Sequence, residues 1–229
     1  MTQNLTIIFD LDGTLVDTAP DLMSAHNHVM KKFGYETKST EDIRKLVGKG
    51  AKSLIGRSVW GQAKNEFEKI NDDGVKKEMV TEFINYYGKN IANESKLISG
   101  ALDFLKWCKK SNISMGVCTN KPDYLAIDLL KKINVYNYFE YVAGSNTFDY
   151  CKPDPRHLTN IVEIMQGDLD KSLMIGDSET DSSTAKAANI PFILLENGYT
   201  EKKTNEIPHD HLIKDFIGIE KIISSYVNG

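Results

Sequence analysis

Short apolar runs rich in β-branched residues recur along the chain, and most are followed by polar residues and then by a helical pattern. The apolar runs predict strands at residues 5–8, 113–118, 141–144, 172–176 and 192–195, of which 141–144 is the weakest. Helical spacing predicts helices at residues 101–110, 155–165, 178–188 and 216–226, and another that carries Leu125, Leu129 and Ile133. Strands that alternate with helices form βαβ units, so we predict an α/β fold with a Rossmann-like parallel sheet.

The spacing of the first two predicted strands predicts the domain organisation. A βαβ unit takes about 30 residues, but the first strand ends at Asp10 and the next begins only at Ile113. The residues between them show helix patterns: one helix ends at Phe33, and the clearest later pattern lies at residues 75–87. We therefore predict an inserted helical cap domain of residues 17–95 and a core of residues 1–16 and 96–229. A cap over the strand ends is well placed to act as a lid.

Composition narrows the possible partners. The 229 residues carry a formal net charge of −4, which gives no basic surface for nucleic acid and fits poorly with an anionic membrane. No apolar run approaches a membrane span, and the first residues lack the positive region of a signal peptide. The three cysteines are widely spaced, which favours reduced thiols over disulfides or a zinc site. We therefore expect a cytoplasmic protein, a monomer or a homodimer, that binds neither nucleic acid nor membrane.

Polar side chains follow the predicted strands at the sheet edge where parallel α/β folds bind ligands. They are Asp10 and Asp12, Thr119 and Asn120, Lys152, and Asp177 and Asp181. Taken singly, each has an ordinary alternative, because Thr, Asn and Asp often begin helices and most lysines are solvated. Together they supply a nucleophile, a second carboxyl, an anion-binding hydroxyl and amide, a fixed cation and a metal-binding acid. Metal-assisted phosphoryl transfer needs this set.

The same residues belong to four motifs in a fixed order. These are Asp-Leu-Asp-Gly-Thr from Asp10, Thr-Asn from Thr119, Lys-Pro-Asp-Pro from Lys152, and Gly-Asp-Ser around Asp177, with Asp181 four residues later. Each motif is weak alone, but the ordered set is specific. Over its whole length the chain resembles the haloacid dehalogenase (HAD) superfamily of phosphohydrolases, in the subgroup with a helical cap after the first strand. Within it the chain is most similar to the phosphoglycolate phosphatases, through Val-Gly-Lys-Gly-Ala, Lys-Pro-Asp-Pro and Gly198-Tyr199.

The resemblance implies a Mg²⁺-dependent hydrolase of phosphomonoesters that acts through an aspartyl-phosphate. Asp10 would attack phosphorus, and Asp12 would protonate the leaving alkoxide and then activate water. Mg²⁺ would be bound by the Asp10 carboxylate, the backbone carbonyl of Asp12, and Asp177. Asp181 would position the water ligands of Mg²⁺, or Lys152, from the next helical turn.

Other residues would hold the phosphate and the rest of the substrate. The resemblance implies that Thr119 and the backbone amide of Asn120 bind phosphate oxygens, while Lys152 neutralises the nucleophile and the transferring group. In the cap we predict a glycine-flanked cationic turn that contains Arg44, Gly48, Lys49 and Gly50. Lys49 or Arg44 would pair with the carboxylate of 2-phosphoglycolate once the cap closes.

Single positions separate the alternatives. HAD dehalogenases carry Tyr at the position of Asp12, and phosphonate hydrolases also lack this Asp, so both activities are disfavoured. β-Phosphoglucomutases carry a His where this chain has Leu22, which disfavours a phosphotransferase without excluding it. A phosphatase for another small phosphometabolite, such as a sugar phosphate or a nucleotide, stays open. A phospho-accepting receiver domain is the non-enzyme alternative, but it needs roughly half this length, no cap and an acceptor Asp in mid-chain.

Overall fold

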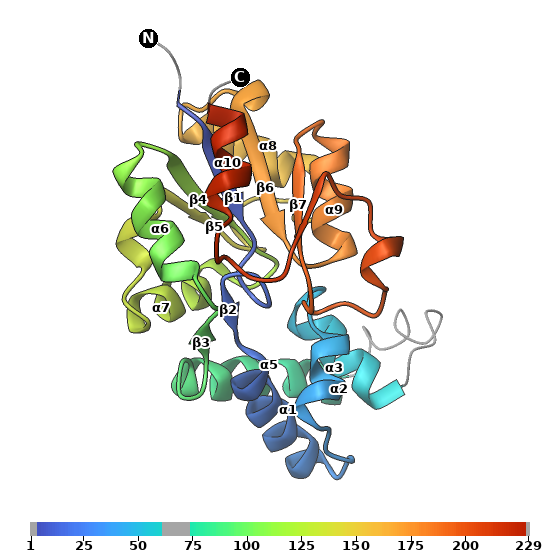
Figure 1. Cartoon of the computed structure of the whole chain (residues 1–229). Coiled ribbons are helices and arrows are strands. Elements are labelled where there is room, and N and C mark those ends of the chain that lie inside the picture. Colours follow the sequence, from blue (N-terminus) through green and yellow to red (C-terminus); the bar gives the residue numbers. More distant parts are fainter. Residues whose placement is uncertain (1–3, 61–73, 228–229) are drawn as a thin grey trace.

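The structure is a computed structural model and describes residues 4–60 and 74–227. Six parallel strands form one sheet in the order β5-β4-β1-β6-β7-β8 (Figure 1). Their bounds are β1 (Thr6–Phe9), β4 (Ser114–Cys118), β5 (Tyr141–Ala143), β6 (Ser172–Gly176), β7 (Phe192–Leu195) and β8 (His211–Ile213). The predicted α/β fold with a parallel sheet is confirmed. The edge strand β8 was not among the predicted strands, because it is short and partly exposed.

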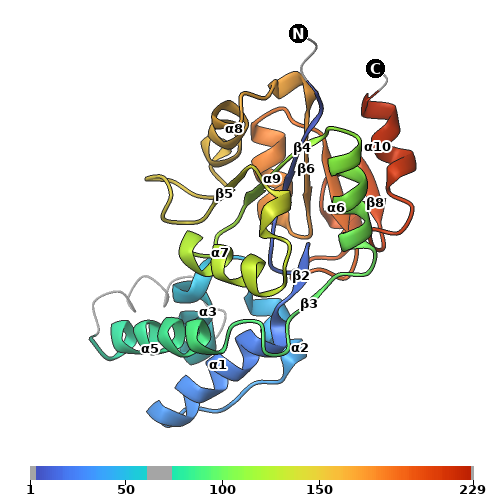
Figure 2. The ribbon, with the colours of Figure 1, turned by 90° about the vertical axis from the view of Figure 1, so that its left-hand side faces the viewer.

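The sheet is buried on both faces, as continuous apolar strands predict. In β1, which lies between β4 and β6, Ile7, Ile8 and Phe9 are fully buried. Because side chains alternate along a strand, Ile7 and Phe9 pack in one core cluster and Ile8 packs in the other. The first cluster includes residues of α6 (Ala101–Lys110), α7 (Asp123–Lys132) and α10 (Glu220–Val227), and the second includes residues of α8 (Pro155–Ile164) and α9 (Glu179–Ala187). Figure 2 shows α6 and α10 on the opposite side of the sheet from α8.

The remaining elements lie close to their predicted positions. β6, β7 and α6 match the predicted ranges, whereas α10 begins at Glu220 instead of Phe216. Among the described residues, short 3-10 helices lie in the connections at Tyr136–Tyr138, Leu169–Lys171 and Thr204–Glu206. Within the described residues, no helix has both the length and the apolar character needed to cross a membrane.

Beyond the carboxyl ends of the strands lies a group of helices that we call the helical cap (Figures 1 and 2). Its described helices are α1 (Ala19–Phe33), α2 (Thr40–Leu46), α3 (Gly50–Trp60) and α5 (Gly74–Asn90). The first of them ends at Phe33 as predicted, because Gly34 takes a left-handed conformation with a φ of 78°. Residues 61–73, which we also assigned to the cap, lie outside the described residues.

The cap is joined to the core by two crossings of the chain that lie side by side. The chain enters through β2 (Val16–Asp17) and returns through β3 (Lys96–Leu97), and these two strands pair in antiparallel fashion. The buried carboxylate of Asp21 in α1 reinforces this junction, since it accepts a hydrogen bond of 2.9 Å from the backbone N–H of Ser95. On this basis we propose that the cap domain spans residues 17–95.

Candidate active site

Predicted catalytic residues from separate strand ends meet at one edge of the sheet. Asp10 follows β1, Thr119 follows β4, Asp177 follows β6, and Lys152 lies on the loop after β5. All four side chains are buried. Because β4, β1 and β6 are neighbours in the sheet, residues far apart in the sequence come together in space.

Lys152 joins two acidic groups. Its Nζ donates hydrogen bonds to Oδ1 of Asp10 at 2.7 Å and to Oδ1 of Asp181 at 2.6 Å. Burial opposes the charged form of this lysine, but the two carboxylates outweigh burial and raise the pKa of Lys152 above its ordinary value. Burial also raises the pKa of Asp10 to about 6, against the opposite effect of Lys152. The lysine therefore stays charged and provides a fixed cation beside Asp10.

Asp177 is held against the turn that follows β1. Thr14 Oγ1 donates to its Oδ1 at 2.7 Å, and the backbone N–H of Tyr199 donates to its Oδ2. Gly13 has a φ of 88°, and a Cβ at this position would lie 2.4 Å from Asp177 Oδ2, so the close approach requires glycine. Burial and two neighbouring carboxylates raise the pKa of Asp177 well above its ordinary value.

The buried acids fit a divalent metal ion. Carboxylate oxygens of Asp10, Asp177 and Asp181 lie within 4.8 Å of one another. Mg²⁺ prefers oxygen donors, and its charge would offset the repulsion between these acids. Asp181 is already engaged, because Oδ2 accepts the hydroxyl of Ser178 at 2.7 Å and Oδ1 accepts Lys152. Asp10 and Asp177 accept hydrogen bonds as well, so the assignment of Asp10, Asp177 and the backbone carbonyl of Asp12 as ligands, with Asp181 as their support, stays a prediction.

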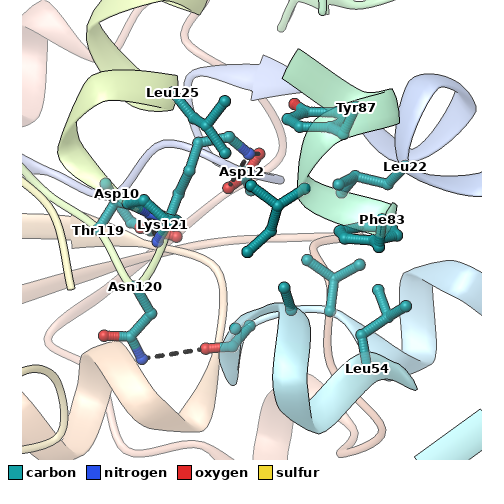
Figure 3. A pocket seen from close by; sticks show the side chains of 16 residues that line it. Asp10, Asp12, Leu22, Leu54, Phe83, Tyr87, Thr119, Asn120, Lys121 and Leu125 are labelled. Atoms are coloured by element: carbon teal, nitrogen blue, oxygen red, sulfur yellow. Dashed lines mark hydrogen bonds and ion pairs between the residues drawn. The ribbon is translucent and has the colours of Figure 1, made fainter. Parts of the chain in front are cut away.

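Asp12 is oriented by two residues to which the sequence analysis gave no role in the site. Lys121 Nζ donates to Oδ1 and Oδ2 of Asp12, at 2.6 and 2.8 Å (Figure 3). Thr18 stands at the N-cap of α1, but its hydroxyl donates to Asp12 Oδ1 at 2.6 Å and makes no capping bond. The signal for Lys121 was its place in the Thr-Asn-Lys-Pro run after β4. Sequence spacing alone does not tell where so long a side chain ends.

Thr119 and Asn120 connect the end of β4 to its surroundings. Thr119 Oγ1 accepts a hydrogen bond from the backbone N–H of Lys121 at 3.2 Å. Asn120 Nδ2 donates to the carbonyl of Lys152 at 3.0 Å and to the carbonyl of Gly48 at 3.2 Å, the latter drawn in Figure 3. Asn120 thus ties the core to the cap, and phosphate binding by Thr119 and the Asn120 amide stays a prediction.

A pocket lies between the strand ends and the cap (Figure 3). The lining residues on the core side are largely polar and include Asp10, Asp12, Thr119, Asn120 and Lys121. Those on the cap side are mostly apolar and include Leu22, Val47, Leu54, Phe83 and Ile84. A small molecule that reacts at Asp10 would extend toward the cap, so the apolar residues would surround the part of it that leaves.

The predicted cationic turn is shorter than we expected. Arg44 belongs to α2 and Gly50 begins α3, so the turn spans only residues 47–49. The Arg44 guanidinium pairs with Asp17 at 2.7 Å and lies over the ring of Tyr199, 5.4 Å from its centroid. Because helical geometry carries Arg44 toward the β2 junction, its placement in a substrate-facing turn was wrong.

Lys49 lies in the turn, but its side chain is half exposed, and its Nζ lies 3.7 Å from a carboxylate oxygen of Glu179. Gly48 and Gly50 line the pocket, whereas Lys49 and Arg44 do not. Each of these two cations is directed toward an acid outside the pocket, and their pairing with the leaving group once the cap closes stays a prediction.

Comparison with known proteins decides the family. Residues 7–195 match the family model described as haloacid dehalogenase-like hydrolase. The chain belongs to this family. It is 36% identical over 222 residues to a phosphoglycolate phosphatase of Agrobacterium fabrum, covering 95% of this chain and 93% of that protein. It is 34% identical over 210 residues to a phosphoglycolate phosphatase of Mesorhizobium japonicum, covering 92% and 90%.

The fold of this HAD hydrolase is also found in solved structures. The crystal structure of a predicted phosphoglycolate phosphatase from Haemophilus somnus matches it with a TM-score of 0.86 and 28% identity, covering 97% of this chain and 99% of that one. The resemblance identified from four short motifs is therefore confirmed, and the protein is an enzyme of the HAD hydrolase family.

Proposed function

We propose that this HAD hydrolase is a Mg²⁺-dependent phosphatase that hydrolyses 2-phosphoglycolate through an aspartyl-phosphate on Asp10. One observation carries the proposal. Asp10 is buried at the end of β1, with the Lys152 ammonium 2.7 Å from one of its oxygens. Both Asp10 and Asp12 line the same pocket. A carboxylate held by a fixed cation beside a second carboxyl is suited to nucleophilic displacement at phosphorus.

The first half-reaction transfers the phosphoryl group to the protein. Lys152 holds Oδ1 of Asp10, so Oδ2 attacks phosphorus and a new oxygen–phosphorus bond forms. The bond between phosphorus and the ester oxygen breaks, and Asp12 gives its proton to the leaving alkoxide. Thr18 and Lys121 keep the Asp12 carboxyl in place for this transfer.

The second half-reaction releases phosphate. Water attacks the phosphorus of the aspartyl-phosphate and gives a proton to Asp12, which now acts as a base. The bond between phosphorus and Asp10 breaks, and inorganic phosphate leaves with the Asp10 carboxylate restored. Asp10 and Asp177 would hold Mg²⁺, which supplies positive charge against the repulsion between carboxylate and phosphate. Lys152 and Thr119 hold the phosphate oxygens during both steps.

Two features support 2-phosphoglycolate over the alternatives. The relatives from Agrobacterium fabrum and Mesorhizobium japonicum are named phosphoglycolate phosphatases. The cap side of the pocket is largely apolar, which offers few partners for the hydroxyls of a sugar phosphate. Leu22, which stands where mutases carry a His, is buried and lines the pocket, so a phosphotransferase is disfavoured here as well.

A substrate panel tests this function. Purified protein is assayed with Mg²⁺ against about two dozen phosphomonoesters, including 2-phosphoglycolate, sugar phosphates, nucleotides and p-nitrophenyl phosphate. We expect the highest kcat/KM with 2-phosphoglycolate, and we expect EDTA to abolish activity and added Mg²⁺ to restore it. A clearly higher kcat/KM with a sugar phosphate or nucleotide would reject the substrate, and full activity after exhaustive EDTA treatment would reject the metal.

A further inference from the structure

We propose that Lys121 and Tyr87 form a subsite for a carboxylate on the leaving group of the substrate. This inference rests on the proposed phosphatase function and names the residues that select its substrate. Both residues line the pocket, Lys121 from the core and Tyr87 from α5 of the cap. The subsite therefore comes from two parts of the molecule.

Lys121 is the one cation among the described residues that line the pocket. Its side chain is only 5% exposed, and its Nζ lies 4.7 Å from the centroid of the Tyr87 ring. An ammonium has three hydrogens to donate, and two of them are directed at the Asp12 carboxylate. In such a buried position, a bond from this ammonium to a substrate carboxylate is stronger than in water.

Tyr87 brings a hydrogen-bond donor that none of the described residues uses. Its side chain is 1% exposed, and its hydroxyl has no hydrogen-bond partner in residues 4–60 and 74–227. Burial raises the pKa of Tyr87 well above its ordinary value, so the hydroxyl keeps its proton. A buried hydroxyl without a partner is costly and calls for an explanation, and a ligand bound in the pocket would provide one. Figure 3 shows this hydroxyl directed toward the side of the pocket where Lys121 meets Asp12.

The position of Lys121 matches the chemistry of a short acid ester. In 2-phosphoglycolate the carboxylate carbon is two bonds from the ester oxygen that must receive a proton. Asp12 must come close to this ester oxygen to protonate it. Lys121 contacts Asp12, so it is also within reach of the substrate carboxylate. Arg44 and Lys49 are bound to Asp17 and Glu179 outside the pocket. The apolar neighbours Leu22 and Leu125 limit water around the subsite.

The test compares two esters that differ only at the carboxylate. The kcat/KM ratio of 2-phosphoglycolate to ethyl phosphate is measured for the wild type and for Lys121→Met. The ratio removes any loss that both esters share because Asp12 is less well held. We expect Lys121→Met to lower the ratio by about 10- to 100-fold. Lys131→Met is the matched control, since Lys131 also lies over a tyrosine ring, Tyr136, but is exposed on α7, and it should leave the ratio unchanged.

Tyr87→Phe removes a single oxygen, so it tests separately whether the hydroxyl contributes to substrate selection and whether it contributes to stability. Because the hydroxyl has no partner in the described residues, its loss should leave the melting temperature unchanged or raise it. The same change should lower the ester ratio by about three- to tenfold. An unchanged ratio would remove Tyr87 from the subsite, and a lower melting temperature would give it a structural role instead.

Further outcomes distinguish this inference from the proposed function. If the wild type prefers 2-phosphoglycolate and Lys121→Met keeps that preference, the subsite is wrong and the function stands. A second pair, 3-phosphoglycerate and glycerol 3-phosphate, covers the reverse case. If only that pair shows an acid preference, and Lys121→Met removes it, the subsite stands and 2-phosphoglycolate is wrong. If the wild type prefers the acid in neither pair, both the subsite and 2-phosphoglycolate as the substrate are wrong.

Discussion

The two sides of the pocket are built in different ways. The core side places Asp10 and Asp177 at the ends of the adjacent strands β1 and β6, and Lys152 reaches Asp10 from the loop after β5. The cap side brings apolar residues from α1, α3 and α5 against them, with Tyr87 as a polar exception. The difference suggests a division of labour in which the sheet positions the reacting groups, and the cap together with Lys121 surrounds the leaving group.

Raised pKa values occur on both sides of the pocket. Burial and neighbouring carboxylates raise those of Asp10 and Asp177 on the core side, and burial raises that of Tyr87 on the cap side. Such shifts concentrate where charges must be handled during a reaction. Mutations of Asp10 or Lys152 should therefore affect every substrate, whereas mutations of Lys121 or Tyr87, which meet where the two sides face each other, should affect substrates selectively.

The largest effect is expected from Asp10→Asn. The amide is nearly isosteric but is not a nucleophile, so kcat should fall by about 10⁴-fold or more for every phosphomonoester. The fold should persist, because Lys152 keeps its partner Asp181. Circular dichroism checks the fold, and mass spectrometry checks for deamidation back to Asp. Activity within tenfold of the wild type would place the nucleophile elsewhere.

A smaller and substrate-dependent loss is expected from Asp12→Asn. The variant cannot protonate an alkoxide, so kcat for alkyl phosphates should fall by about 10²- to 10³-fold. p-Nitrophenol leaves without a proton, so phosphoenzyme formation from p-nitrophenyl phosphate should be much less impaired. Rapid-quench measurement of that first step compares the two classes, and equal impairment would show that Asp12 is not the general acid.

The stability of the protein should also depend on pH through His157, which lies on the core side. This buried imidazole accepts a hydrogen bond from the Lys152 backbone N–H at 3.1 Å, and burial together with the Lys152 charge lowers its pKa to about 4. In the unfolded chain His157 has its ordinary pKa of 6.5. As the pH falls, the unfolded chain therefore binds this proton at a higher pH than the folded protein does. Stability should therefore fall as the pH drops from 6.5 toward 4, by at most about 3 kcal/mol from this one group.

Denaturant unfolding across this pH range measures that loss. His157→Asn provides the comparison, because an amide oxygen can replace Nδ1 as acceptor but does not titrate. The variant should lose less stability between neutral and acidic pH than the wild type does, whatever its stability at neutral pH. Parallel profiles for the two proteins would show that His157 does not contribute to acid sensitivity.

The smallest effect is expected from Lys49→Ala. Its contact with Glu179 is half exposed, and such pairs contribute little. We expect kcat/KM for 2-phosphoglycolate to change by less than about threefold. Arg44→Ala should weaken the β2 junction and reduce turnover of 2-phosphoglycolate and p-nitrophenyl phosphate alike. A selective loss on 2-phosphoglycolate in either variant would return carboxylate recognition to these cations.

Much of the core side was predictable from the sequence. A fully buried strand followed at once by two carboxylates places Asp10 at a sheet edge whatever the rest of the fold. The long gap before Ile113 predicted an insertion, because one βαβ unit is much shorter. These inferences depend on local pattern and chain order, and both can be read directly from the sequence.

The cap side was not predictable in the same way. Gly48 and Gly50 within the run from Arg44 to Ala51 are typical of a turn, but most of the run is helical, and helical geometry directs Arg44 to Asp17. Lys121 reaches Asp12 through a long side chain whose direction depends on tertiary packing against Tyr87. Such contacts between distant elements cannot be predicted from local sequence patterns.

The antiparallel pairing of β2 with β3 has a consequence for protein engineering. Val16 lies opposite Leu97 and Asp17 lies opposite Lys96, so the points where the chain leaves and rejoins the core are neighbours. A hairpin turn of about two to five residues can span such a pair. The helical insert can thus be treated as an exchangeable cassette. A chimaera with a foreign cap should keep Asp10, Lys152 and Asp177 in register while acquiring the donor's residues on the cap side of the pocket.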